Sequence, residues 1–84
     1  MPYRIEIKKP AEKWFKKYPR EIQKRFTKKI LKLEKDPEKR GKPLSGGLSG
    51  YWELYFERKF RIVYTIDKKN EIVYIEGVRH KDEF

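Results

Sequence analysis

Hydrophobic and polar residues alternate through the centre of the chain, in two segments at residues 51–56 and 60–66. Strict alternation is typical of half-buried β-strands, and the aromatic side chains in both segments favour strands further. Opposed residues of an antiparallel pair share a face, so pairing Phe56 with Phe60 across a three-residue loop keeps the two apolar sets together. The same register sets Tyr55 opposite Arg61 on the other face, which Glu53 shares. The pattern therefore predicts a hairpin with one buried face and one open face.

The polarity pattern elsewhere predicts further strands and helices. From the N-terminus these are a strand at residues 3–8, a helix at 11–18, a helix at 19–35, a loop at 38–50, the two hairpin strands, and a last strand from 71 to 77 or 78. Pro19 ends the first helix and can begin the second, which Pro37 stops. The order β-α-α-β-β-β predicts one α+β domain over residues 1–84, with an antiparallel sheet and a two-helix hairpin packed on one face.

A loop rich in glycine and serine, residues 45–50, precedes the hairpin. It lacks the GxxxxGK[ST] spacing of a phosphate-binding loop and leads into a strand instead of a helix, so we reject that interpretation. We expect its glycines to allow tight turns and close packing onto the sheet. Leu44 and Leu48 are expected to anchor the loop.

Composition narrows the classes of function. Lys and Arg outnumber Asp and Glu by 23 to 13, which gives a net charge of +10 and favours a polyanionic partner such as nucleic acid. The chain has no cysteine and a single histidine, so we expect neither a metal site nor a cofactor. No apolar run approaches the roughly 20 residues of a membrane helix, and the N-terminus is too polar for a signal peptide. We therefore expect a cytoplasmic protein without a membrane partner.

The open face of the hairpin is the candidate site. Further basic residues flank the hairpin loop and end the last strand: Arg58, Lys59, Arg79, His80 and Lys81. If the last strand neighbours the hairpin, these groups converge on one patch with Arg61 and Tyr55. Guanidinium groups beside an aromatic ring suit RNA, because phosphate accepts the guanidinium hydrogen bonds and a base stacks on the ring.

A purely structural explanation of the same residues stays open. Glu53 and Arg61 are close enough for a diagonal ion pair of small stabilising value, and Tyr55 could stack on Arg61 at the surface. A histidine near the chain end, such as His80, is often incidental. The basic face of the second predicted helix is in the same way the solvated side of that helix, although it could also contact nucleic-acid phosphates.

The central run resembles the RelE/ParE superfamily of bacterial and archaeal toxins. The segments that carry the resemblance are KPLSGGLSGYWELYF, FRIVYTI and the closing VRHKDEF. They match a Lys-x-Leu pair, a Gly-containing loop, an aromatic-Glu-Leu strand, an aromatic-Arg strand ending in Tyr, and a basic-His-basic tail. The order of the first strand and the helices agrees as well, so the resemblance covers essentially the whole chain. Within the superfamily, the chain is most similar to RelE-like messenger-RNA interferases.

This resemblance implies a toxin of a type II toxin–antitoxin system that cuts messenger RNA in the ribosomal A site and is held inactive by a RelB-like antitoxin. It implies a metal-independent endoribonuclease, in which the 2′-hydroxyl attacks the neighbouring phosphate and expels the 5′-oxygen. Arg61 matches the arginine that holds the phosphate. The family's C-terminal basic segment supplies a general acid or charge stabiliser, and it is matched here by Arg79, His80 and Lys81.

The chain departs from the family pattern at two places. Some members carry lysines where this chain has Glu53 and Tyr55, so Glu53 is a possible base. Many members end in a tyrosine that stacks on a base, whereas this chain ends in Phe84, which can stack but transfers no proton. Two alternatives therefore stay open: a ParE-like toxin that inhibits DNA gyrase, and a non-catalytic basic module that binds an acidic partner.

Overall fold

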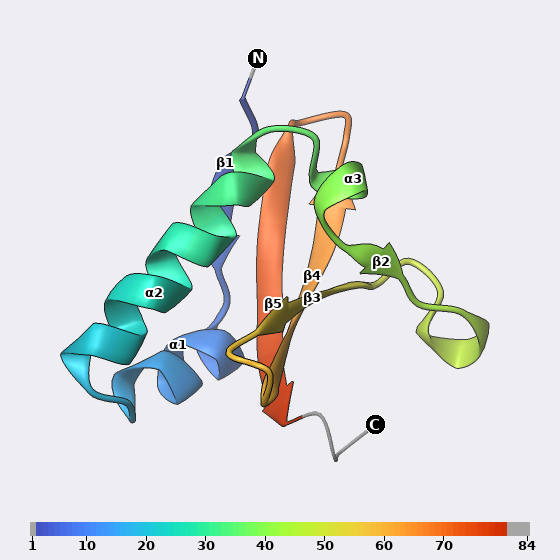
Figure 1. The fold of residues 1–84 in the computed structure, drawn as a ribbon. Helices are drawn as coiled ribbons and strands as arrows, with labels where there is room; N and C mark the ends of the chain where they lie inside the picture. Colours follow the sequence, from blue (N-terminus) through green and yellow to red (C-terminus); the bar gives the residue numbers. More distant parts are fainter. Residues whose placement is uncertain (1, 81–84) are drawn as a thin grey trace.

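The computed structural model describes residues 2–80 of the chain. Its elements are β1 (Arg4–Ile7), α1 (Lys9–Lys16), α2 (Arg20–Leu31), the 3₁₀ turn η1 (Lys32–Glu34), α3 (Pro37–Arg40), β2 (Lys42–Pro43), the 3₁₀ turn η2 (Gly46–Leu48), β3 (Trp52–Phe56), β4 (Phe60–Asp67) and β5 (Ile72–His80) (Figure 1). The α+β class is confirmed, as is the order of the long helices and strands. None of the described helices is long and apolar enough to cross a membrane.

β3 and β4 form the hairpin that the polarity pattern predicts. Phe56 lies opposite Phe60 and Tyr55 opposite Arg61, so the predicted register and three-residue loop are confirmed. Burial explains the register: Leu54 and Phe56 are only 8% and 3% exposed, whereas Tyr55 between them is 49% exposed. A slip by one residue would exchange the buried and exposed sets.

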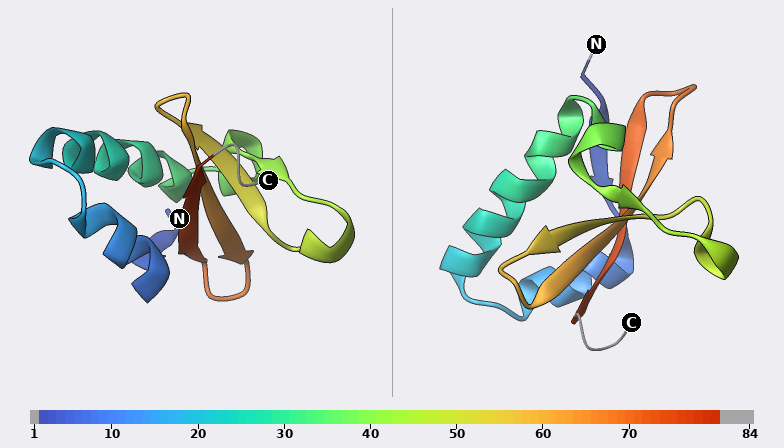
Figure 2. Two further views of the ribbon diagram at one scale, coloured as in Figure 1. Left: turned by 90° about the horizontal axis from the view of Figure 1, so that it is seen from below. Right: turned by 45° about the vertical axis from the view of Figure 1, so that its right-hand side comes forward.

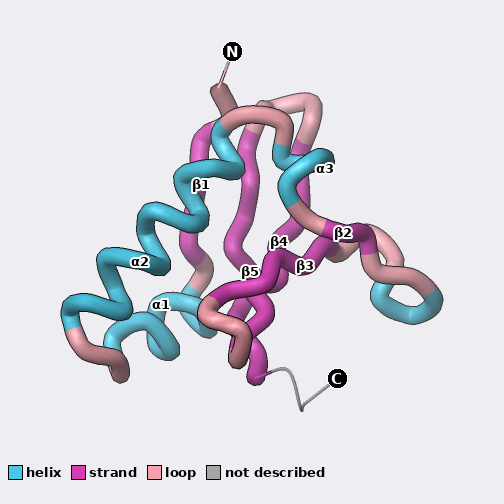
Figure 3. The backbone as a smooth tube through the Cα atoms, in the orientation of Figure 1, coloured by secondary structure: helices cyan, strands magenta, loops and turns pink. Residues whose placement is uncertain are grey.

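The five strands form one sheet in the order β1-β5-β4-β3-β2, with α1 and α2 on one face (Figures 1 and 3). Neighbouring strands are antiparallel except β1 and β5, which are parallel, with Ile5 opposite Val73. The prediction of an antiparallel sheet is therefore wrong for this one pair. α2 carries the chain back to the end of the sheet where β1 starts, and the meander from β3 to β5 reverses direction twice, so β5 runs the same way as β1.

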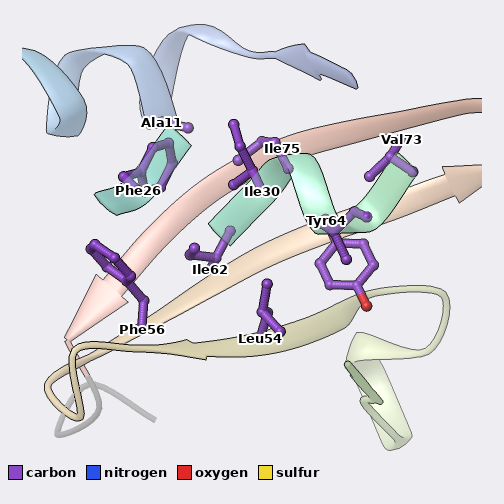
Figure 4. Packing of buried hydrophobic residues seen from close by; sticks show 10 residues of the cluster. Ala11, Phe26, Ile30, Leu54, Phe56, Ile62, Tyr64, Val73 and Ile75 are labelled. Carbon is purple, nitrogen blue, oxygen red and sulfur yellow. The ribbon is translucent and has the colours of Figure 1, made fainter. Parts of the chain in front are cut away.

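The hydrophobic core lies between the helices and the covered face of the sheet (Figure 4). Phe26 and Ile30 of α2 point into it, and Ile62 and Tyr64 of β4 meet them from the sheet. The Trp14 ring lies 5.3 Å from that of Phe26, and such ring pairs add about 0.5–1.5 kcal/mol to the free energy of burial. Aromatic burial thus compensates for the small number of apolar positions in this highly charged chain.

The segment 38–50, which the sequence pattern assigns to a loop, contains β2 and all of α3 except its first residue, Pro37. Contacts made far along the chain create these short elements. The Tyr64 hydroxyl donates a 2.8 Å hydrogen bond to the Pro37 carbonyl, and burial raises the pKa of Tyr64 to about 12. Gly41 passes so close to β3 that a Cβ there would lie 2.5 Å from the Glu53 carbonyl oxygen. Such contacts depend on the folded sheet, so local sequence does not reveal them.

Candidate functional site

The open face of the sheet, opposite α1 and α2, holds Glu53, Tyr55 and Arg61 together, as the hairpin pattern predicts. Arg61 Nη1 lies 3.1 Å from Glu53 Oε2, and the two side chains are 24% and 8% exposed. The guanidinium carbon of Arg61 lies 5.2 Å from the centre of the Tyr55 ring. The ion pair and the cation–π contact are both present, and they hold one guanidinium group between a carboxylate and a ring.

Lys42 joins this face from β2, and sequence reasoning missed it. It lies opposite Glu53 in the strand register, and its Nζ lies 5.8 Å from the centre of the Tyr55 ring. The Tyr55 ring is therefore contacted by one cationic group from each of its two neighbouring strands, β2 and β4. β2 is only two residues long, so its polarity pattern cannot indicate which way Lys42 faces. The only signal in the sequence is the Lys-x-Leu pair that precedes the Gly/Ser loop.

Arg79 reaches the same face through a β-bulge in β5. Arg79 lies directly opposite Arg61, whereas the register shifts between Val63 and Tyr64 and leaves Glu76 as the extra residue of β5. A bulge reverses the alternation of side chains on its strand, and here it turns the arginine toward the open face. Two guanidinium groups opposite each other on one sheet face disfavour folding. Such a local conflict is typical of a ligand site.

His80 does not converge with the two arginines. It lies opposite Phe60 on the face covered by the helices, and its ring packs edge-on against the Phe60 ring at 5.8 Å. The expected single patch of basic residues is therefore corrected: within residues 2–80, Arg61 and Arg79 share the open face and His80 takes the other one. Lys81 and Phe84 lie outside the described residues.

The loop between β3 and β4 carries Arg58 and Lys59, and both are exposed. Glu57 and Arg58 have φ angles of 54° and 61°, the left-handed region that favours glycine. A 3.2 Å ion pair between Glu57 and Arg25 connects this loop to α2. Because β4 begins opposite the last residue of β5, Arg58 and Lys59 lie at the same end of the sheet as Arg79.

The Gly/Ser loop borders a groove on the open face, with a volume of about 750 Å³. The prediction of tight turns is confirmed by the positive φ angles of Gly46 and Gly50, 66° and 96°. Close packing of the loop onto the sheet is wrong, because a Cβ on Gly46, Gly47 or Gly50 would have no atom within 4 Å. Leu48 is 44% exposed and does not anchor the loop. In Figure 2 the loop extends away from the sheet, on the side opposite the helices.

Comparison with solved structures relates this fold to known toxins. The chain is similar to the toxin–antitoxin complex RelBE2 from Mycobacterium tuberculosis, with 27% identity, a TM-score of 0.86, and coverage of 95% of this chain and 99% of that chain. It is also similar to the archaeal RelE–RelB complex from Pyrococcus horikoshii OT3, with 21% identity, a TM-score of 0.77 and full coverage of both chains, 100% and 100%. It is similar as well to a mutant of the Escherichia coli toxin RelE in the free state, with 19% identity, a TM-score of 0.78, and coverage of 99% of this chain and 87% of that chain. The last two likenesses concern the fold alone.

Comparison of sequences gives the family. No curated protein sequence matches the chain. The model of the family described as the ParE toxin of the type II toxin-antitoxin system parDE matches residues 5–83, nearly the whole chain. This match, the shared fold and the open-face arginines agree with the resemblance of the central motifs. The chain therefore belongs to the ParE toxin family, within the RelE/ParE superfamily of type II toxin–antitoxin toxins.

Proposed function

We propose that this toxin is a RelE-like, metal-independent endoribonuclease that cuts messenger RNA in the A site of the ribosome and so inhibits translation. The observation that carries the proposal is the pair of arginines, Arg61 and Arg79, directly opposite each other on the open face. Cleavage by an attacking 2′-hydroxyl builds negative charge on the phosphoryl oxygens. Two adjacent guanidinium groups stabilise that charge, since each offers forked donors to phosphate. Because translating ribosomes and messenger RNA are cytoplasmic, the proposal implies that the toxin acts in the cytoplasm.

Glu53 acts in this proposal as the residue that positions Arg61 and not as the general base. Its carboxylate is engaged by the Arg61 guanidinium at 3.1 Å and its side chain is 8% exposed, so it has little access to a substrate hydroxyl. Lys42 of β2 adds a third cation to this face, because it lies opposite Glu53 of β3 and its Nζ lies near the Tyr55 ring. Tyr55 offers an exposed ring for a base. Lys59 and Arg58 extend the basic surface for the RNA backbone.

Three residues of the implied site, two of them catalytic candidates and one a stacking candidate, need separate tests. His80 packs against Phe60 on the helix-covered face, which argues against direct contact with the phosphate held by Arg61. Lys81 lies outside the described residues, and it stays within the proposal as a candidate general acid or charge stabiliser. Phe84 keeps its role as a candidate stacking residue. Cleavage by His80→Ala, Lys81→Ala and Phe84→Ala variants separates the three.

Primer extension on messenger RNA with translating ribosomes tests the central proposal. We expect Arg61→Ala and Arg79→Ala each to reduce the cleavage rate by roughly 10²–10³-fold, as for removal of one donor that stabilises the transition state. Arg4→Ala is the matched control, because it removes the same charge from an exposed 3.4 Å ion pair with Glu6 on the edge strand. Wild-type protein that leaves the message intact, or equal cutting by wild type and Arg61→Ala, contradicts the proposal.

Inhibition of DNA gyrase is the second candidate function, favoured by the match of residues 5–83 to the ParE toxin family. A ParE-like toxin acts by binding and needs no nuclease site. A gyrase supercoiling assay beside a translation assay distinguishes the two. Loss of supercoiling with translation intact supports the ParE-like function, and the reverse supports RNA cleavage. If expression causes no growth defect and the protein shows only salt-sensitive binding to an acidic partner, the result supports the non-catalytic basic binding module.

The partner we propose is a RelB-like antitoxin. The solved relatives from Mycobacterium tuberculosis and Pyrococcus horikoshii are complexes of toxin with antitoxin. A net charge of +10 suits an acidic, partly disordered partner that folds on binding. We expect a companion reading frame beside the gene and co-purification of its product, and the absence of both would count against this partner.

A further inference from the structure

Two large apolar side chains, one on the Gly/Ser loop and one directly after it, lie exposed without a packing role that explains them. Leu48 is 44% exposed and Tyr51 is 38% exposed. Both line the open-face groove, together with Leu44, which directly precedes the Gly/Ser loop, and Val63 of β4. Exposed apolar residues that gather around one groove are typical of a binding site, whereas scattered ones are ordinary surface.

The wall of this groove is built in advance of any ligand. The Leu44 N–H donates to the Tyr51 carbonyl at 2.9 Å, and the Tyr51 N–H donates to the Leu48 carbonyl at 3.1 Å. Gly46 and Gly50 supply the two left-handed φ angles that the turn needs. The loop is therefore closed by its own backbone, and shortening a side chain leaves that backbone framework intact.

The floor and edge of the groove combine open space with fixed polar groups. Gly77 lies in the floor, and a Cβ there would meet no atom within 4 Å. Arg79 supplies donors at one side. Glu76 supplies acceptor oxygens, and its carboxylate is held by Thr65 Oγ1 at 2.7 Å and by Lys8 Nζ at 3.2 Å. A slot with apolar walls and both donors and acceptors at its edge fits a flat ring with polar edges.

The groove is continuous with the arginine pair. Val63 lies two residues from Arg61 on the same face of β4, which is about 7 Å along the strand. Arg79 belongs to both features, since it lies opposite Arg61 and also lines the groove. A ligand whose phosphate meets the arginines can therefore place a neighbouring group in the groove. In single-stranded RNA that neighbouring group is a base.

We propose that this groove binds one nucleobase of the RNA, next to the nucleotide whose phosphate meets Arg61 and Arg79. Tyr51 and Leu48 contact the face of the base, and Arg79 and Glu76 meet its polar edge. The inference rests on the proposed function in that RNA is the ligand, but it is a statement about binding and needs neither ribosome nor cleavage. It adds base contacts by a loop that the sequence pattern assigned to packing.

A non-cleavable 2′-O-methyl oligonucleotide, carrying 2-aminopurine at one position, tests the groove by fluorescence. A second oligonucleotide with an abasic site at that position measures binding through the backbone alone. We expect wild-type protein to bind the base-containing oligonucleotide about 5- to 150-fold more tightly than the abasic one, the range of stacking on an aromatic side chain. Leu48→Ala and Tyr51→Ala should remove most of this difference and leave abasic binding unchanged.

Two further variants sharpen the test. Gly77→Val fills the floor of the groove where there is free space, and it should also abolish the preference for the base. Leu31→Ala is the matched control for Leu48→Ala, because Leu31 is similarly exposed, at 46%, but lies on α2. It should leave the preference intact. Thermal unfolding of each variant confirms that the fold is retained.

Three outcomes overturn the inference. Equal affinity of wild-type protein for both oligonucleotides shows that no base is bound. Equal loss in Leu31→Ala and Leu48→Ala shows a general effect of surface apolarity. Release of a co-purified antitoxin by Leu48→Ala and Tyr51→Ala, with RNA binding unchanged, shows that the groove is a protein interface. Failure of ribosomal cleavage alone overturns the proposed function and leaves base binding supported by the oligonucleotide result.

Discussion

Replacement of Gly41 by alanine should severely destabilise the protein, although any residue can adopt the backbone conformation of Gly41. Its φ of −120° and ψ of −170° lie in the extended region, so the substitution adds no backbone strain. The added methyl group would instead collide with the Tyr64 hydroxyl and lie 2.5 Å from the Glu53 carbonyl oxygen. The first contact involves a fully buried side chain and the second involves the backbone of β3, so neither can move cheaply.

The magnitude follows from the groups that must shift. Overpacking of a filled site costs about 1–3 kcal/mol. Displacement of the Tyr64 hydroxyl also breaks its 2.8 Å hydrogen bond and leaves the Pro37 carbonyl unpaired, at a further cost of about 1–3 kcal/mol. The sum, about 2–6 kcal/mol, is a large share of the roughly 4–13 kcal/mol expected for 84 residues at about 0.05–0.15 kcal/mol each. We expect Gly41→Ala to be largely unfolded or marginally stable.

Urea denaturation followed by tryptophan fluorescence measures this effect, since Trp52 stacks on Tyr64 at 6.3 Å and reports on the site. Gly47→Ala is the control, because a Cβ there meets no atom within 4 Å, and its effect should stay within about 0.5 kcal/mol. Tyr64→Phe alone leaves the Pro37 carbonyl unpaired, so Gly41→Ala and Tyr64→Phe together should cost less than their sum by about 1–3 kcal/mol. Strict additivity, or a Gly41→Ala variant as stable as Gly47→Ala, refutes the reasoning.

Three further predictions concern single groups. Because burial raises the pKa of Tyr64 from 10.0 to about 12, its contribution to stability is complete below pH 10 and is lost as the pH rises to 12; urea titrations should show this loss in wild type but not in Tyr64→Phe. Arg58→Gly relieves a φ of 61° and should raise stability by up to about 1 kcal/mol while weakening RNA binding, whereas Lys59→Gly relieves no positive φ and should weaken RNA binding while lowering stability by about 0.4–1 kcal/mol. Hydrogen bonds from Asn70 lower the pKa of Asp67 from 3.8, so its stabilisation is lost as the pH falls through the lowered value; Asn70→Ala should raise that pKa in an NMR titration.

The hairpin could be predicted from the sequence because large apolar residues alternate with mostly polar ones along both of its strands. Tyr55 and Arg61 carry polar groups between large apolar neighbours, so only one register buries Leu54 and Phe56 against the helices while placing Tyr55 and Arg61 on the open face. The Glu53–Arg61 pair follows from that register. The open-face site was predictable to the extent that it belongs to this hairpin.

The remainder of the site depends on contacts that no local pattern contains. Lys42 reaches Tyr55 because Gly41 lets the chain pass against β3 and because Tyr64 binds the Pro37 carbonyl. The groove exists because the Gly/Ser loop extends away from the sheet, whereas its composition is equally compatible with packing onto it. Short elements with few residues of their own take their shape from the long strands beside them.

The bulge in β5 decides which candidate catalytic group shares a face with the arginine of β4. Ile75 and Val78 both pack with the core, but they are three residues apart, and strict alternation would turn one of them outward. The extra residue Glu76 resolves this conflict and reverses the faces beyond it. Without it, His80 would face the open side and Arg79 would face the helices. The demand of one aliphatic side chain for burial thus selects a pair of arginines, and not an arginine with a histidine, as the centre of the open face.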